Sequence, residues 1–195
     1  KWKSVYSQGK KKYNFLCLNG YPRKHRNEVY KKLKNVKQGF VSHQTHNDYK
    51  KAPYASYNFD NVDNFIKLKT LYKSAWVSIV TESIYSDGPG IITEKTLLAI
   101  AAKHPFMCVG HQHIHQEIAE RGFENYNEIF DLDYDVIESE FRLDAAIQMN
   151  LESIISADFD VGVAKDKVER NYDFLMNDYM QSIEDRASKQ LKEII

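Results

Sequence analysis

WVSIVTESIYSDGPGIITEKTLLAIAAKHPFMCVG, residues 76–110, contains two short apolar runs separated by a turn-rich loop and a helical pattern. The β-branched run at 76–80 is typical of a buried strand, and residues 86–90 are rich in turn-forming residues. The apolar run at 106–109 predicts a second strand. A strand, a helix and a strand in this order indicate a β-α-β unit, so we expect an α/β fold with an open, mostly parallel sheet and flanking helices.

The segment between these two strands has the features of a helix start and a helix end. Thr93 can accept a hydrogen bond from an unpaired N–H group of the first turn. The position before Pro105 disfavours the α region, so the helix should end near His104. The apolar residues expected on its buried side are Leu97, Leu98, Ile100 and Ala101.

Polar residues cluster where the first of these strands ends. In open α/β sheets, ligands bind beyond the carboxyl ends of the strands, where helix N-termini supply partial positive charge. Glu82 and Ser83 end the strand, and three further polar residues open the helix, so all five should face one crevice. The candidates for binding the ribose or the sugar there are Glu82, Ser83, Thr93 and Glu94. A carboxylate there can bind a pair of sugar hydroxyls, and an ammonium can pair with phosphate. The three residues that open the helix, which are also favourable first-turn residues without any ligand, are Thr93, Glu94 and Lys95.

Candidate phosphate ligands also occur near the start of the chain. Residues 13–18 predict a first strand, and residues 24–34 have apolar residues at helical spacing with lysines between them. Arg26 would lie in the first turn of that helix, where a guanidinium can bind phosphate oxygens through two parallel hydrogen bonds. Arg23 is the second candidate. A surface position without a ligand is the alternative for both arginines.

These motifs, in this order, resemble the C-terminal half of fucosyltransferase-like glycosyltransferases of the GT-B type. The resemblance extends over residues 13–135. The segments that carry it are RNEVYKKL at 26–33, TES at 81–83, ITEKT at 92–96, KHPFMCVG at 103–110, GF at 122–123 and FDLDYD at 130–135.

The resemblance implies a Rossmann-like domain that binds a sugar nucleotide, usually GDP-fucose. It places Glu94 on the sugar side of the donor, and Lys95 and Arg26 on its phosphates. In that family an asparagine commonly stands at the position of Ser83 and a tyrosine at that of Ile91. These two differences leave the base and the sugar of the expected donor open.

The resemblance also limits what this chain is expected to contain. In GT-B enzymes the acceptor, usually a glycan or another hydroxyl compound, binds largely in the N-terminal half, which also supplies the carboxylate base. This chain begins at Lys1 without an initiator methionine, and we expect it to be a donor half that lacks an N-terminal acceptor domain. We therefore assign no catalytic residue.

Length and apolar spacing predict the domain organisation. At 195 residues, 43% of them hydrophobic, the chain can bury a full core. We expect an N-terminal tail at 1–12, a Rossmann-like sugar-nucleotide-binding domain at 13–157 and a helical extension at 158–195. Further elements expected from periodicity are a strand at 40–42, a long polar loop at 43–63, and helices at 64–74, 136–155 and 165–195.

Basic residues are concentrated at the start of the chain. Residues 1–51 contain 14 Lys or Arg and two acidic residues, whereas the remaining 144 contain 13 and 25. A basic segment suits a nucleotide diphosphate and would also suit nucleic acid, although lysines on solvated helix faces explain much of it. The acidic remainder repels phosphate backbones, so a nucleic-acid-binding module is an alternative rather than the expectation. A non-catalytic interaction domain derived from a transferase is the other alternative.

Two clusters have residue types that bind metals. His111, His113 and His115 alternate as they would on one face of a strand, but the following residues look helical and no further ligand completes a zinc site. Residues 131–135 carry three aspartates but lack the glycine and the glutamate of an EF-hand loop. We therefore expect no metal, and no cofactor other than the sugar nucleotide as substrate.

The cysteines and the lengths of the apolar stretches bear on where in the cell the protein is expected. Cys17 and Cys108 lie in apolar runs, so buried free thiols are expected rather than a disulfide. No stretch approaches the length of a membrane span, and the first residues do not resemble a signal peptide. We therefore expect a cytoplasmic protein.

Overall fold

The computed structural model describes residues 10–20, 22–43, 62–156, 160–179 and 181–182. Within these residues, parallel strands form one sheet in the order β2-β1-β3-β4. The α/β, Rossmann-like fold class is therefore confirmed. The strands are β1 (Tyr13–Leu18), β2 (Gly39–Ser42), β3 (Ala75–Thr81) and β4 (Phe106–Val109).

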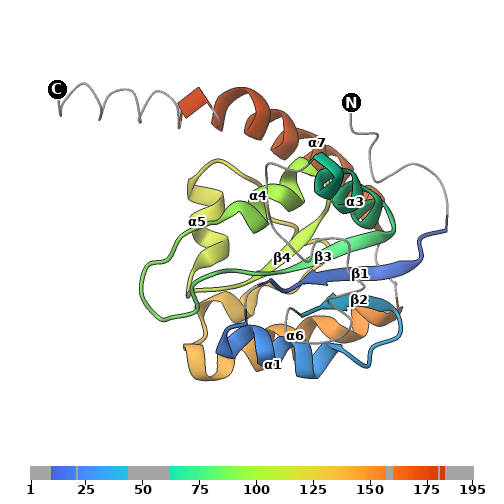
Figure 1. Ribbon diagram of the computed structural model, residues 1–195. Coiled ribbons are helices and arrows are strands. Elements are labelled where there is room, and N and C mark those ends of the chain that lie inside the picture. The colour runs from blue at the N-terminus through green and yellow to red at the C-terminus, as the bar shows by residue number, and fades with distance from the viewer. Residues whose placement is uncertain (1–9, 21, 44–61, 157–159, 180, 183–195) are drawn as a thin grey trace.

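Helices cover both faces of the sheet (Figure 1). Helices α1 and α6 lie on one face, and α3, α4 and α7 lie on the other. The α-helices are α1 (Lys24–Leu33), α3 (Val62–Lys73), α4 (Glu94–Ala101), α5 (Ile114–Glu120), α6 (Ser139–Ser156) and α7 (Lys165–Phe174). Shorter turns are the 3-10 helices η1 (Asp133–Val136) and η2 (Val161–Ala164) and the π-helix η3 (Leu175–Tyr179). Among the described residues, no helix combines the length and the apolar character needed to cross a membrane.

The sheet has a topological switch point between β1 and β3. The first β-α-β unit places β2 on one side of β1, whereas β3 pairs with the other side. In open α/β sheets, ligands bind outside the carboxyl ends of the strands at such a point. Helix α1 begins after β1, and α4 begins after β3. The N-termini of these two helices therefore lie at the same edge of the sheet.

The central strands are apolar because both of their faces are covered. Phe15, Leu16 and Cys17 of β1 are essentially inaccessible, as expected for a parallel strand between two helical layers. A side chain at Gly39, in the neighbouring strand, would stand 2.1 Å from the Phe15 ring. The missing side chain at that position lets the ring cross the adjacent strand.

Both thiols are buried and free, as predicted from their apolar surroundings. Burial raises the pKa of Cys17 to about 12 and raises that of Cys108 as well. A thiol held in its protonated form is a poor nucleophile and a poor metal ligand. These cysteines therefore contribute to the core.

The prediction for α4 was correct in its start and for the burial of Ile100, but wrong for its two leucines and for its end. Leu97 and Leu98 are only half-buried, and the helix ends at Ala101 rather than at His104. Thr96 turns inward because its hydroxyl donates to a buried carboxylate, described below, which sets the rotation of the helix. The residues that face the sheet are Thr96, Ala99 and Ile100.

The long helix predicted from residue 136 is also corrected. The chain first forms η1, and α6 begins only at Ser139, whose N–H and hydroxyl both donate to Asp87. Phe141, an apolar residue at helical spacing in this segment, is 59% exposed, whereas Arg142 is buried. The helix predicted at 165–195 is present as α7 and η3. Residues 183–195 and most of the predicted loop, 44–61, lie outside the described residues.

Candidate functional site

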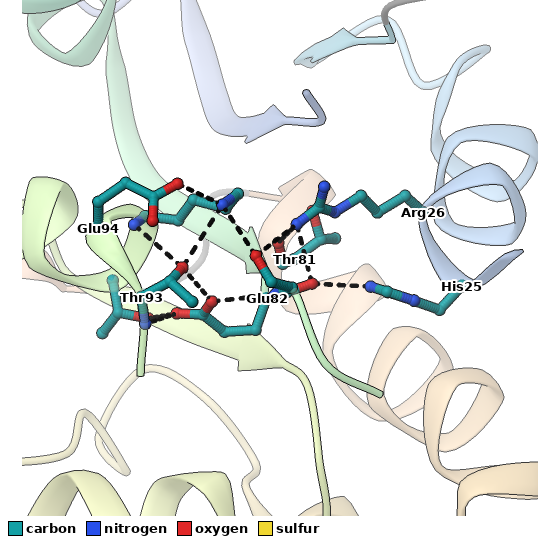
Figure 2. A network of polar contacts seen from close by, with 9 residues as sticks. His25, Arg26, Thr81, Glu82, Thr93 and Glu94 are labelled. Atoms are coloured by element: carbon teal, nitrogen blue, oxygen red, sulfur yellow. Dashed lines mark hydrogen bonds and ion pairs between the residues drawn. The ribbon is translucent and has the colours of Figure 1, made fainter. Parts of the chain in front are cut away.

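Two cations from different helices converge on one hydroxyl at the switch point. Arg26 of α1 donates from Nη2 to Ser83 Oγ at 3.4 Å, and Lys95 of α4 donates from Nζ to the same oxygen at 3.2 Å. Figure 2 shows this network at the carboxyl end of β3. The sequence placed these residues in one crevice although they are far apart in the chain, and their proximity is confirmed.

Arg26 is more deeply buried than a surface phosphate ligand would be. Its side chain is 2% exposed, and Nη2 also donates to the backbone oxygens of Thr81 at 3.3 Å and Glu82 at 3.0 Å. These bonds attach the start of α1 to the end of β3. Nη2 is shared among these acceptors, and the two-bond phosphate contact expected of Arg26 stays a prediction. Its contribution is positive charge and the position of Ser83.

Lys95 is the cation that faces the crevice. Its side chain is 14% exposed, and Nζ donates to Thr93 Oγ1 at 3.4 Å and to Glu94 Oε1 at 2.5 Å. The Glu94 side chain is 47% exposed. Partial burial raises the pKa of the Glu94 carboxyl, but the hydrogen bond and charge of Lys95 oppose this and the net shift is downward. The ammonium is therefore held by an exposed acid and by neutral hydroxyls.

Glu82 acts within the protein rather than in the crevice. Its carboxylate is 0% exposed and accepts hydrogen bonds from Ser83 N at 3.1 Å and from Thr93 N at 3.1 Å. It also accepts from the hydroxyls of Thr93 and Thr96. These bonds fasten the start of α4 to the end of β3. The sugar-binding role predicted for Glu82 is corrected accordingly, since no ligand atom can reach its carboxylate.

Thr93 caps α4 as predicted, since its hydroxyl accepts from Lys95 N. Thr96, which the sequence analysis did not single out, lies three residues later, and its hydroxyl donates to the Glu82 carboxylate as that of Thr93 does. Two threonines three residues apart lie on the same face of a helix, so their spacing in the sequence could have indicated that both hydroxyls reach one group. Arg23 is the exposed N-cap of α1, and it makes no contact with the cluster in the described part of the chain.

His25 is a further site residue that the sequence reasoning did not select. It is 7% exposed, and its Nε2 lies 2.8 Å from the Glu82 backbone oxygen, to which Arg26 also donates. Its ring stacks on Tyr85 with centroids 5.1 Å apart. Burial is the main reason why the pKa of His25 falls to about 4, so the imidazole is neutral at pH 7.

Two hollows border the cluster. One is a cavity of about 20 Å³ behind Lys95, lined by apolar residues of β1 and β3 and by Ser78. The other is an open groove of about 540 Å³ between the starts of α1 and α6. The groove is lined by Lys24, His25, Glu28, Tyr85, Ser139, Glu140, Leu143 and Asp144. His25 thus borders both the groove and the cation cluster.

The loop between β3 and α4 is fixed to its surroundings. Tyr85 donates its hydroxyl proton to Ser139 O and accepts from Leu143 N, which secures the first turn of α6. Farther along the loop, a side chain at Gly90 would stand 2.1 Å from the His111 ring. The loop is therefore packed on both sides.

The three alternating histidines, for which no zinc site was expected, point to different places. His111 is buried and pairs with Glu117 through Nε2 at 2.7 Å, whereas His113 is exposed with a left-handed backbone. The imidazole of His115 is buried and accepts from Cys108 N at 3.0 Å. Asp135, from the acidic run, accepts from His115 N. Within the described residues, no group of three such ligands is arranged to hold a metal ion.

Comparisons with known proteins returned no match. Neither the scan against family models nor the searches of curated proteins and of solved structures found a protein similar to this chain. The functional interpretation therefore depends on the geometry of the site and on the sequence motifs.

Proposed function

We propose that the carboxyl edge of this sheet binds a nucleoside-diphosphate sugar, GDP-fucose-like in its chemistry, as the donor domain of a glycosyltransferase. The sugar would be transferred to a hydroxyl of a glycan or similar acceptor. The observation that carries the proposal is the convergence of Arg26 and Lys95 on Ser83 Oγ at the topological switch point. Buried free thiols suit a reducing compartment, which supports a cytoplasmic location.

Lys95 is the direct phosphate ligand in this proposal. Its ammonium can exchange Glu94 and two neutral hydroxyls for phosphate oxygens. Arg26 adds a second positive charge next to Ser83, and the N-terminus of α4 adds roughly half a charge more. Together they would offset the charge that develops on the diphosphate as the sugar leaves, which is how preorganised cations accelerate such reactions.

Glu94 has a complementary role. In the absence of ligand its carboxylate neutralises Lys95. A phosphate on the ammonium releases that carboxylate, which can then accept from two hydroxyls of the ribose or the sugar. The Glu-Lys pair therefore fits a ligand that carries both phosphate and vicinal hydroxyls.

Replacing Lys95 with alanine should weaken the binding of a nucleoside diphosphate about 10- to 100-fold. A hydrogen bond to a charged group contributes roughly 1.5–3 kcal/mol, and this variant removes one. The measurement is isothermal titration calorimetry with GDP, UDP and ADP and with their sugar conjugates.

Lys37→Ala is the matched control for this experiment. Lys37 is exposed at the opposite, amino edge of the sheet, and its loss changes the net charge by the same amount. It should leave affinity unchanged. Absence of binding by the wild type to every compound would end the proposal, and so would equal binding by the wild type and the Lys95 variant.

Glu94→Gln should change the relative affinities of two ligands. Inorganic pyrophosphate should bind up to about fivefold more tightly, because the variant removes a competitor for Lys95 and a partly exposed ion pair contributes at most about 1 kcal/mol. The sugar nucleotide should lose affinity relative to pyrophosphate, since a carboxylate that accepts from hydroxyls is gone. Parallel titrations measure the ratio. A parallel change for both ligands would show that Glu94 does not contact hydroxyls.

The two alternatives give different results. A non-catalytic domain would bind the donor but transfer sugar to no member of a glycan acceptor panel. A nucleic-acid-binding module would shift an oligonucleotide in a salt-sensitive gel assay and ignore sugar nucleotides.

A further inference from the structure

The tautomer of His25 is fixed by its position. The Glu82 backbone oxygen can only accept, so the Nε2 that lies 2.8 Å from it carries the proton. The lone pair then resides on Nδ1, which is turned away from that bond (Figure 2). Nδ1 makes no hydrogen bond to the described residues. Stacking on Tyr85 holds the plane of the ring.

The imidazole of His25 lies between the cation cluster and the groove. His25 Nε2 and Arg26 Nη2 donate to the same oxygen, so the imidazole borders the cluster directly. The same ring lines the 540 Å³ groove. The groove also presents ionic and hydroxyl groups able to bind polyhydroxylated compounds. A molecule in this groove would therefore lie beside a donor bound at Lys95.

We infer that His25 is the general base that accepts the proton of the acceptor hydroxyl, with the groove between α1 and α6 as the acceptor site. This inference rests on the proposed function, and it places a base within this chain rather than in a separate acceptor domain. A carbonyl-oriented neutral imidazole whose other nitrogen is directed at substrate is a common arrangement for a catalytic base.

The reaction step balances without a further reactant. The acceptor oxygen forms a bond to the anomeric carbon of the sugar, and the bond from that carbon to the diphosphate oxygen breaks. The electron pair of the broken bond leaves on the diphosphate, next to Lys95 and Arg26. The proton of the acceptor hydroxyl moves to His25 Nδ1 and then to solvent.

The charges around His25 fit this role. Burial lowers the pKa of the imidazole most, the hydrogen bond to the Glu82 backbone and the Glu82 charge raise it, and the charges of Arg26 and Arg23 lower it further. A bound diphosphate would add negative charge on the side of Arg26 and raise the pKa of His25, because opposite charge favours the protonated form. The base would thus strengthen when the donor is present. The charged groups on the groove side are Lys24, Glu28, Glu140 and Asp144.

His25→Gln is the informative variant, because the glutamine amide can keep the donation to the Glu82 oxygen while the basic nitrogen is lost. Release of nucleoside diphosphate should be followed with the full chain from pH 4 to 8, with GDP-fucose, GDP-mannose, UDP-glucose and ADP-glucose. Water and a glycan panel serve as acceptors. We expect unchanged donor affinity and a fall in turnover of about 10²- to 10⁴-fold. The acidic limb of the wild-type pH profile should disappear in the variant.

His113→Asn is the matched control, since it removes an exposed histidine outside the site and asparagine tolerates its left-handed backbone. Wild-type turnover by His25→Gln would overturn the base assignment and leave donor binding intact. Donor binding by the wild type without release of diphosphate to any acceptor would overturn it equally. Failure of the wild type to bind any sugar nucleotide would instead remove the proposed function itself. If His25→Gln lost donor affinity or failed to fold while its turnover kept the pH dependence of the wild type, the role of His25 would be structural only.

Discussion

Replacing Arg142 with methionine should lower the free energy of unfolding by about 2–5 kcal/mol, because a buried acceptor left without its donor costs about 1–3 kcal/mol and Arg142 donates to several. The Arg142 side chain is 1% exposed and donates to the backbone oxygens of Gly110, Ile137 and Ser86. It also pairs with Asp87 and lies over the Tyr85 ring. Methionine fills a similar volume but leaves the oxygens of Gly110 and Ile137 without the donor that Arg142 supplies, whereas Ser86 O still accepts from Gln112 N.

Urea denaturation at pH 7 measures this effect. The matched control is Arg170→Met, which removes a solvent-exposed arginine paired with Glu124 and should leave the midpoint nearly unchanged. Similar midpoints for the two variants would mean that the oxygens around position 142 find other donors. Arg142→Lys should recover only part of the loss, because one ammonium cannot span acceptors that a guanidinium reaches in several directions.

Acid should destabilise the protein through His104. This imidazole is 0% exposed, accepts from Ser78 Oγ at 2.7 Å and donates to Ala75 O at 3.0 Å. Burial is the main cause that lowers the pKa of His104 to about 4. The unfolded chain, with an ordinary histidine pKa near 6.5, binds the proton first, so stability is complete above pH 6.5 and falls toward pH 4. The expected loss is about 3 kcal/mol at pH 4.

The free energy of unfolding from urea titrations at pH 7, 6, 5 and 4 measures this loss. His104→Gln keeps a donor for Ala75 O and removes the titrating group. Its free energy of unfolding should be lower at pH 7 but should fall less steeply with acid. The difference in slope against pH should correspond to the uptake of about one proton on unfolding. An identical slope in the variant and the wild type would contradict the assignment to His104.

Local signals predicted the elements of the fold. The strand Tyr13–Leu18 and the helix start after Thr93 were predicted with the boundaries that the structure has. Burial within a helix was harder to predict, because it depends on which neighbour the helix meets. Leu97 and Phe141 look like core residues by spacing, yet side-chain bonds from distant loops rotate α4 and delay the start of α6.

The site was predictable in its location but not in its detail. The order of strands and helices places residues 26 and 95 at one edge, since both follow strands that end there. The burial of Glu82 was not visible, because its partners are the N–H groups and hydroxyls of the helix it was expected to accompany. His25 was overlooked because its bond to the Glu82 oxygen joins residues 57 positions apart.

The close approach of Gly90 to the His111 ring ties two distant positions together. Any side chain at 90 would displace the imidazole, which is itself held by Glu117. Evolution can therefore enlarge residue 90 only if residue 111 shrinks. Substitutions at positions 90 and 111 should therefore occur together in related proteins, even where the rest of the loop sequence differs.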